Sequence, residues 1–346
     1  MSPEPSLLLG MALVCTGGFV DGSLGLALKY PKLWKWEHLW LVFTFMAFGI
    51  IPWIVGIITV NDLFGVLRLA KHSDLLVVFL YGLGWGCGAV LYGLALRFAG
   101  MALTYAIVMG LTAAIGSFAP LALLHWQEIF TLRGRVIIGA VLLIVLGVVL
   151  CAWAGHLKEK ALAATEGRRT LATGQRPVLG VVLAILSGIF SPMSNLSFAY
   201  GTPLSDLAVD MGTSTLLAPN VIWVIALSAG SAVNVVYCSV LISKARSWGV
   251  FSRPSRDYFL GLLMGVLGPA SFVLYGMGSS QLGDLGAVIG WPIMASMGIL
   301  GANLWGTLTG EWRGVGRRPF IVMSLAVALL TVAMFVLGWA ESQAGK

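Results

Sequence analysis

Ten long apolar segments make up most of this chain, and short polar loops separate them. Each segment has about the 20 residues that a helix needs to cross a bilayer. Because lipid offers the backbone no hydrogen-bond partners and alternating barrel-strand patterns are lacking, we predict that every segment is a helix. The predicted spans are 6–28, 37–60, 75–97, 100–125, 135–155, 178–200, 214–242, 258–281, 284–308 and 319–340.

Two stretches of the chain match at a constant offset of 183 residues. Gly82, Tyr92, Gly93, Gly100, Glu128 and Arg135 have counterparts in Gly265, Tyr275, Gly276, Gly283, Glu311 and Arg318. The first and sixth spans also align, less strictly, at an offset of 171. Each stretch lies in a run of five spans, so the second run crosses the bilayer in the opposite sense.

This pattern predicts an all-α integral membrane protein of ten transmembrane helices in two inverted five-helix repeats. The first repeat is 6–155 and the second is 178–340, and the polar segment 156–177 joins them as a cytoplasmic linker. Inverted repeats with a binding site between them are the usual architecture of a secondary transporter. The repeat therefore favours transport before any single residue is considered.

The distribution of charge predicts the orientation in the membrane. Only 10% of residues are charged and 58% are hydrophobic. Of the 21 Lys and Arg residues, 16 lie in loops that follow odd-numbered spans. The positive-inside rule places these loops in the cytoplasm and both termini in the periplasm. The net charge of +7 therefore reflects topology and attraction to anionic membrane lipid, and it does not predict a nucleic-acid partner.

Signatures of enzymes are missing from the sequence. The four histidines lie far apart at membrane edges, without the spacing of metal ligands. The sequence shows no nucleophile elbow, phosphate-binding loop or pair of catalytic carboxylates. It thus predicts no enzyme, no metal site and no cofactor.

Glycine and proline mark places where helices are expected to pack closely or to break. In the third span, Gly82/Gly86 and Gly84/Gly88 are each spaced by four residues, which lets another helix approach closely. A proline within a span can interrupt the helix and free carbonyl groups for binding. Pro192 and Pro292 are of most interest, because polar or aromatic residues surround them.

Asp21 is the only carboxylate well inside a predicted span. An acidic group at the centre of a membrane helix costs on the order of 2.5–3.5 kcal/mol, and such groups are often functional. Asp21 could couple transport to protons or accept hydrogen bonds from substrate hydroxyls. The alternative is a structural Asp that bonds a neighbouring helix or lies in a water-filled vestibule.

Amide and aromatic side chains within the spans suggest a sugar site. An amide in hydrocarbon needs partners, which can be substrate hydroxyls or a neighbouring helix. Trp85 and Trp291 are not explained by the aromatic belt at the membrane surface, and an indole face can pack on the C–H face of a sugar. The predicted substrate-binding residues are Trp85, Tyr92, Asn195, Asn220, Asn234, Trp291 and Asn303, each of which could instead have a purely structural role.

Several motifs resemble one known family, the L-rhamnose–proton symporters of the drug/metabolite transporter superfamily. The two most specific are the stretch from Trp85-Gly86-x-Gly88 through Tyr92-Gly93-Leu94 to Gly100-Met101, and the run from Glu311-Trp312 to Gly316-Arg317-Arg318-Pro319. The others are WKWEHLW, Pro52-Trp53, Arg97, Gly188-Ile189-Phe190-Ser191, Pro219, Asn234 and Trp291. The resemblance covers essentially the whole chain.

This resemblance implies ten helices in a bacterial cytoplasmic membrane and proton-driven uptake of a deoxy sugar. The roles given above to Asp21, Asn195 and Asn220 are not implied by it and come from their chemistry alone. An exporter or exchanger of another small metabolite on the same scaffold is the alternative. The expected partners are a neutral sugar, a proton and membrane lipid, and the sequence does not indicate an oligomeric state.

Overall fold

The structure is a computed structural model that describes residues 6–27, 30–99, 101–166, 177–310 and 312–342. Within these ranges every regular element is a helix. The elements are α1 (Leu7–Ala27), α2 (Trp36–Thr44), η1 (Phe45–Ile50), α3 (Ile51–Thr59), α4 (Leu63–Leu69), α5 (His72–Ala99), α6 (Met101–Leu124), η2 (Trp126–Phe130), α7 (Leu132–Glu166), α8 (Pro177–Phe190), α9 (Met193–Tyr200), α10 (Thr202–Asp210), α11 (Asn220–Lys244), η3 (Trp248–Ser252), α12 (Asp257–Ser280), η4 (Gly283–Leu285), α13 (Gly286–Leu308) and α14 (Arg317–Ser342).

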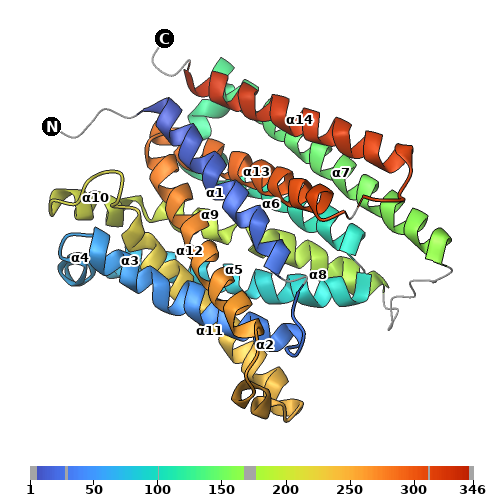
Figure 1. Ribbon diagram of the computed structural model, residues 1–346. Helices are drawn as coiled ribbons and strands as arrows, with labels where there is room; N and C mark the ends of the chain where they lie inside the picture. Colours follow the sequence, from blue (N-terminus) through green and yellow to red (C-terminus); the bar gives the residue numbers. More distant parts are fainter. Residues whose placement is uncertain (1–5, 28–29, 100, 167–176, 311, 343–346) are drawn as a thin grey trace.

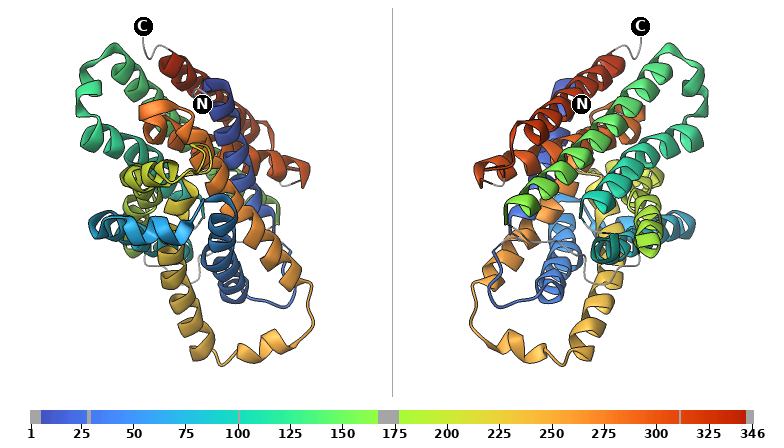
Figure 2. Two further views of the ribbon diagram at one scale, coloured as in Figure 1. Left: turned by 90° about the vertical axis from the view of Figure 1, so that its left-hand side faces the viewer. Right: turned by 90° about the vertical axis from the view of Figure 1, so that its right-hand side faces the viewer.

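In the described part of the chain, ten helical stretches are long and apolar enough to cross a membrane, and they follow the ten predicted spans in order. The start of α1 and the end of α14 lie on the same side of the bundle, as an even number of crossings requires (Figure 1). Of the ten spans, those formed by α13 and α11 are the most buried inside the protein. Figure 2 shows α7 and α14 side by side along one flank.

The glycines of α5 allow two different helices to approach it. A Cβ added to Gly82 would lie 2.3 Å from the carbonyl oxygen of Ala226 on α11, and one added to Gly86 would lie 2.7 Å from that of Gly230. On the other face, a Cβ on Gly88 would lie 2.8 Å from the Ser191 amide nitrogen. The four-residue spacing therefore predicted close packing correctly, and each glycine pair serves a separate neighbour.

Two spans depart from regular α-helix where the sequence places proline. The sixth span breaks at Ser191 and Pro192, between α8 and α9. In the second span, η1 is a π-helix that ends just before Pro52. Pro52 has no N–H to donate four residues back and its ring crowds that carbonyl, so the wider turn relieves the conflict.

The segment predicted as a linker, 156–177, is partly helical. Helix α7 continues through its first part and ends at Glu166, and α8 begins at Pro177. Residues 167–176 lie outside the described residues. Helix α7 therefore extends beyond residue 155, where the predicted fifth span ends.

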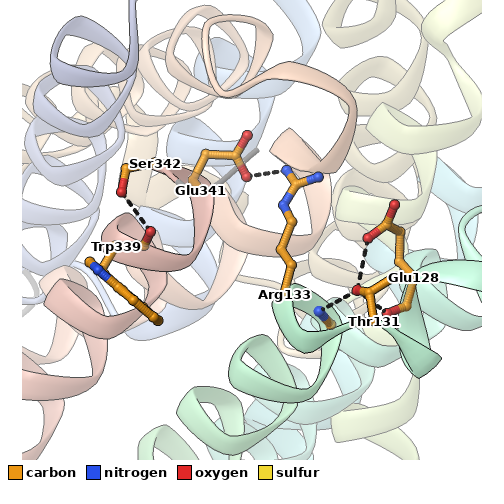
Figure 3. Close-up of polar contacts among 7 residues, drawn as sticks. Glu128, Thr131, Arg133, Trp339, Glu341 and Ser342 are labelled. Carbon is orange, nitrogen blue, oxygen red and sulfur yellow. Dashed lines mark hydrogen bonds and ion pairs between the residues drawn. The ribbon is translucent and has the colours of Figure 1, made fainter. Parts of the chain in front are cut away.

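An ion pair joins the start of α7 to the end of α14 on the side of the termini. Arg133 Nη2 donates to Glu341 Oε2, and the two side chains are only 18% and 9% exposed (Figure 3). Glu128 lies nearby, but its carboxylate accepts a hydrogen bond from the Thr131 hydroxyl at 3.2 Å. The Arg133–Glu341 pair thus fixes the outer helices α7 and α14 to each other.

Breaking this pair on one side should destabilise the protein. We expect Arg133→Met to lower the free energy of unfolding by about 3 kcal/mol, because the Glu341 carboxylate would stay largely buried without a cation. The double variant Arg133→Met/Glu341→Met should recover most of the loss. Thermal unfolding of the three proteins in one detergent measures both effects, and equal stability of the single variant and the parent would contradict the prediction.

Candidate functional site

A cavity of about 390 Å³ lies between helices from the two halves of the chain. From the first half α1, α2, η1, α5 and α6 line it, and from the second half α11, α12, α13 and the turn at Ser191. The volume is within the range of pockets that hold small ligands. A cavity shared by two helical bundles is where a transporter would hold its cargo.

The structure brings five of the eight predicted site residues together. Asp21, Trp85, Tyr92, Asn234 and Trp291 all line the cavity. They come from four helices, α1, α5, α11 and α13. The fold thus assembles the site from distant parts of the chain.

Asp21 lies about two-thirds of the way along α1, and its side chain is exposed toward the cavity. Its carboxylate lies next to Gly298 of α13: a Cβ atom added to Gly298 would lie 3.6 Å from Asp21 Oδ2. Of the described residues that line the cavity, Asp21 alone is charged. A carboxylate in this position can take up and release a proton, and in its ionised form it accepts hydrogen bonds from hydroxyls.

Asn234 is held by three hydrogen bonds where α11 meets α5 and α2. Its Nδ2 donates to Gly230 O at 2.9 Å and to Gly86 O at 3.3 Å. Its Oδ1 accepts from Trp40 Nε1 at 3.0 Å. An amide oxygen has two lone pairs, so Oδ1 has one acceptor site left, in a side chain that is only 1% exposed.

Aromatic rings form the deep end of the cavity. Phe48, Trp85 and Phe272 pack edge to face, with ring centroids 4.9 Å apart for Phe48–Trp85 and 5.4 Å apart for Trp85–Phe272. Trp291 completes this end, and its Nε1 donates to Thr112 O at 3.1 Å. These rings offer apolar faces of the kind that pack on the C–H faces of a sugar.

The other three predicted residues do not line the cavity. Asn195 is fully buried, and its Nδ2 donates to Gly116 O at 2.7 Å and to Ala287 O at 2.9 Å. Asn220 donates to Thr59 Oγ1 at 2.9 Å. Asn303 donates to Ile299 O of its own helix at 2.9 Å. In these three cases the amide joins two helices or bonds its own helix. Each therefore has the purely structural role that the sequence left open as the alternative to sugar binding.

The cavity is closed on the side where the chain begins and ends. There Asn195 of α9 bridges α6 and α13, and its Oδ1 accepts from the buried Tyr275 hydroxyl of α12. Ser117 Oγ on α6 donates to Val288 O on α13 at 2.7 Å. We call the hydrogen-bonded set of Asn195, Tyr275, Ser117 and Val288 the outer seal.

On the other side, the lining reaches the ends of several spans. Trp40 lies in the first turns of α2, and Gly25 lies in the last turn of α1. Ala302 extends the lining toward the end of α13. The cavity therefore runs from the outer seal toward the loops that follow odd-numbered spans.

Comparison with known proteins agrees with this architecture. The family model described as L-rhamnose-proton symport protein matches residues 6–342, nearly the whole chain. The chain belongs to the L-rhamnose-proton symport protein family. This confirms the resemblance seen in the sequence motifs.

Several relatives in the L-rhamnose-proton symport protein family carry the name L-rhamnose-proton symporter. The protein from Klebsiella pneumoniae is 29% identical over 324 residues, and that from Citrobacter koseri is 27% identical over 319 residues. Each alignment covers 90% of this chain and 91% of the relative. One solved structure, described only as a crystal structure of a protein, aligns with 98% of this chain and 100% of its own at a TM-score of 0.54. At 16% identity it shows a similar fold alone.

Residues beyond the predicted set also line the cavity of this family member. Phe48 lies in the π-helix η1 of the second span, Thr44 is the last residue of α2 just before it, and Phe272 comes from α12. Pro52 was the one available signal for the distortion. Phe272 carries no comparable mark, because a phenylalanine within an apolar span is usually ordinary packing.

Proposed function

We propose that this protein is a proton-coupled symporter that imports a neutral sugar, L-rhamnose or a related deoxy sugar, by alternating access. The observation that carries the proposal is the cavity between the two halves of the chain, where Asp21, the one carboxylate among the described lining residues, shares the lining with aromatic rings and an amide. Membership in the L-rhamnose-proton symport protein family supports the sugar and the proton as cargo. It also supports a multi-pass location in a bacterial cytoplasmic membrane.

We infer two inverted repeats, and the helix packing supports them. The first span, α1, packs on α12 and α13, which are the eighth and ninth spans. Its counterpart five spans later, formed by α8 and α9, packs on α5 and α6, the third and fourth spans. The fifth and tenth spans, α7 and α14, pack on each other. This reciprocal packing supports a pseudo-two-fold relation between the two halves.

The charge pattern supports the orientation. The loops that follow odd-numbered spans are rich in Lys and Arg, which by the positive-inside rule supports a cytoplasmic position for these loops and a periplasmic one for both termini. The cavity extends toward these loops and the outer seal closes the opposite side. On this assignment the structure is an inward-open conformation.

The lining residues divide into three roles in the proposed site. Asp21 carries the proton that couples sugar movement to the gradient, and Tyr92 and Asn234 contact sugar hydroxyls. Trp85 and Trp291 supply apolar faces. This division follows the chemistry of each group: one titratable carboxylate, polar atoms that bond hydroxyls, and rings that pack on C–H groups.

Uptake of labelled L-rhamnose into energised membrane vesicles tests the proposed function. An inward proton gradient should drive accumulation above the external concentration, and collapsing the gradient with an uncoupler should return the ratio to about one. Sugar counterflow should persist without the gradient. Counterflow that never becomes gradient-driven accumulation would indicate an exchanger, and absence of any sugar movement would refute sugar transport.

A further inference from the structure

We propose that two pseudo-symmetric tyrosines close the two sides of this transporter in turn. Tyr275 bound to Asn195 closes the outer side in this structure, and Tyr92 bound to Asp21 closes the inner side in the alternate conformation. This inference rests on the proposed alternating-access function and on the inverted repeats. It gives Tyr92 and Tyr275 opposite effects on the conformational equilibrium.

The Tyr275–Asn195 contact has the features of a closed barrier. Both side chains are fully buried, and the Tyr275 hydroxyl donates to Asn195 Oδ1. Through Asn195 Nδ2, the contact is also connected to Gly116 on α6 and Ala287 on α13. It thus ties together helices from both halves at the level of the outer seal.

The repeat counterparts of these residues line the open side. At the offset of 183, Tyr275 corresponds to Tyr92 and Gly116 corresponds to Ile299. At the offset of 171, Asn195 corresponds to Leu24. Tyr92, Ile299 and Leu24 all line the cavity. Residues that meet on the closed side therefore have counterparts that stand apart on the open side.

The packing around each tyrosine follows the same relation. Tyr275 packs edge to face on Trp291, with ring centroids 5.6 Å apart. Tyr92 packs against a small cluster that includes Val108, and Val108 is the counterpart of Trp291 at the offset of 183. The two tyrosines thus occupy corresponding places in the two halves. In this structure Tyr275 contacts α9, so closure of the inner side would bring Tyr92 into the corresponding contact with α1.

Asp21 is the acceptor on α1 that such a movement reaches. Leu24, the counterpart of Asn195, has no hydrogen-bonding atom in its side chain. Asp21 precedes it by three residues, so the two lie on the same helix face, and both line the cavity with Tyr92. A hydrogen bond from the Tyr92 hydroxyl to the Asp21 carboxylate would hold the inner side closed at the residue proposed to carry the proton.

Labelling of a buried cysteine from the periplasm tests the paired gates. Ser279→Cys is a near-isosteric reporter, because Ser279 lies one helical turn beyond Tyr275 and is 2% exposed. The background replaces Cys15, Cys87, Cys151 and Cys238 by alanine and must fold as the parent does. Intact cells are treated with a membrane-impermeant maleimide, and the labelling rate reports the outward-open population.

Tyr275→Phe should raise the labelling rate about fivefold and Tyr92→Phe should lower it about fivefold, the shift expected from one lost hydrogen bond. The matched control is Tyr258→Phe, which loses a hydrogen bond to Phe251 O away from the cavity and should leave the rate unchanged. In an Asp21→Ala background, Tyr92→Phe should have no further effect, because its acceptor is gone.

Equal or same-direction shifts for the two tyrosine variants would overturn the paired gates, and so would a full Tyr92→Phe effect in the Asp21→Ala background. Tyr92 faces an open cavity, so its variant gives a decisive result even if Tyr275→Phe fails to fold. The parent's L-rhamnose uptake is measured separately. Uptake without opposite labelling shifts refutes the gates alone, whereas opposite shifts without sugar uptake refute only the proposed cargo.

Discussion

Asp21→Asn is expected to abolish uphill accumulation of sugar while leaving sugar exchange partly intact. An inward pH gradient of one unit supplies about 1.4 kcal/mol per proton, enough for about tenfold accumulation with one proton per sugar. Asparagine keeps the size and the acceptor oxygen of the side chain but cannot carry the proton. The accumulation ratio should therefore fall from about ten to about one.

Vesicle uptake under an imposed pH gradient measures the ratio, and counterflow measures exchange in the same preparation. Asp206→Asn is the matched control, because it makes the same change at an exposed carboxylate of α10 that does not line the cavity. This variant should accumulate sugar as the parent does. Undiminished accumulation by Asp21→Asn would remove Asp21 from the coupling mechanism.

The course of the chain through the membrane was predictable from the sequence because the bilayer imposes it. Lipid requires long apolar helices, so each of the ten apolar runs corresponds to a membrane-spanning helical stretch. The close approach of neighbours to α5 was also predictable, because glycines spaced by four residues, such as Gly82 and Gly86, form a helix face without side chains that another helix can approach. The extension of α7 to Glu166 was not, because helix outside the bilayer leaves no trace in hydropathy.

The site was only partly predictable because composition does not fix which way a polar side chain faces. Asn234 and Asn195 look alike in the sequence, yet one lines the cavity and the other is enclosed between α6 and α13. The difference depends on the phase of each helix relative to its neighbours. The break at Pro192 and the π-helix before Pro52 both shift that phase, so a regular-helix projection fails in these two spans.

The shape of the cavity also depends on a close backbone contact between α1 and α13. In the sequence, only small residues indicate this contact. Along α1, Gly18 and Gly22 face α13, and Cβ atoms added there would lie 2.4 Å from Met294 O and 2.1 Å from Gly298 O. Such distances are shorter than an ordinary C···O contact of about 3.3 Å. The two helices therefore touch through their backbones, and this contact sets where Asp21 stands relative to α13.

Gly22→Val should accordingly disrupt both the fold and transport. Relief of the contact with Gly298 O requires α1 and α13 to separate by about 1 Å, and overpacking of this kind typically costs about 1–3 kcal/mol. We expect a lower melting temperature in detergent and at least a tenfold loss of sugar uptake per folded molecule, because Asp21 and the cavity wall would move together.

The matched control is Gly139→Val on α7, where an added Cβ meets nothing within 4 Å and the site is not part of the cavity. Fluorescence-detected unfolding and vesicle uptake, both normalised to folded protein, compare the two variants. A Gly22→Val protein as stable and as active as Gly139→Val would show that the α1–α13 contact is not needed to hold the site.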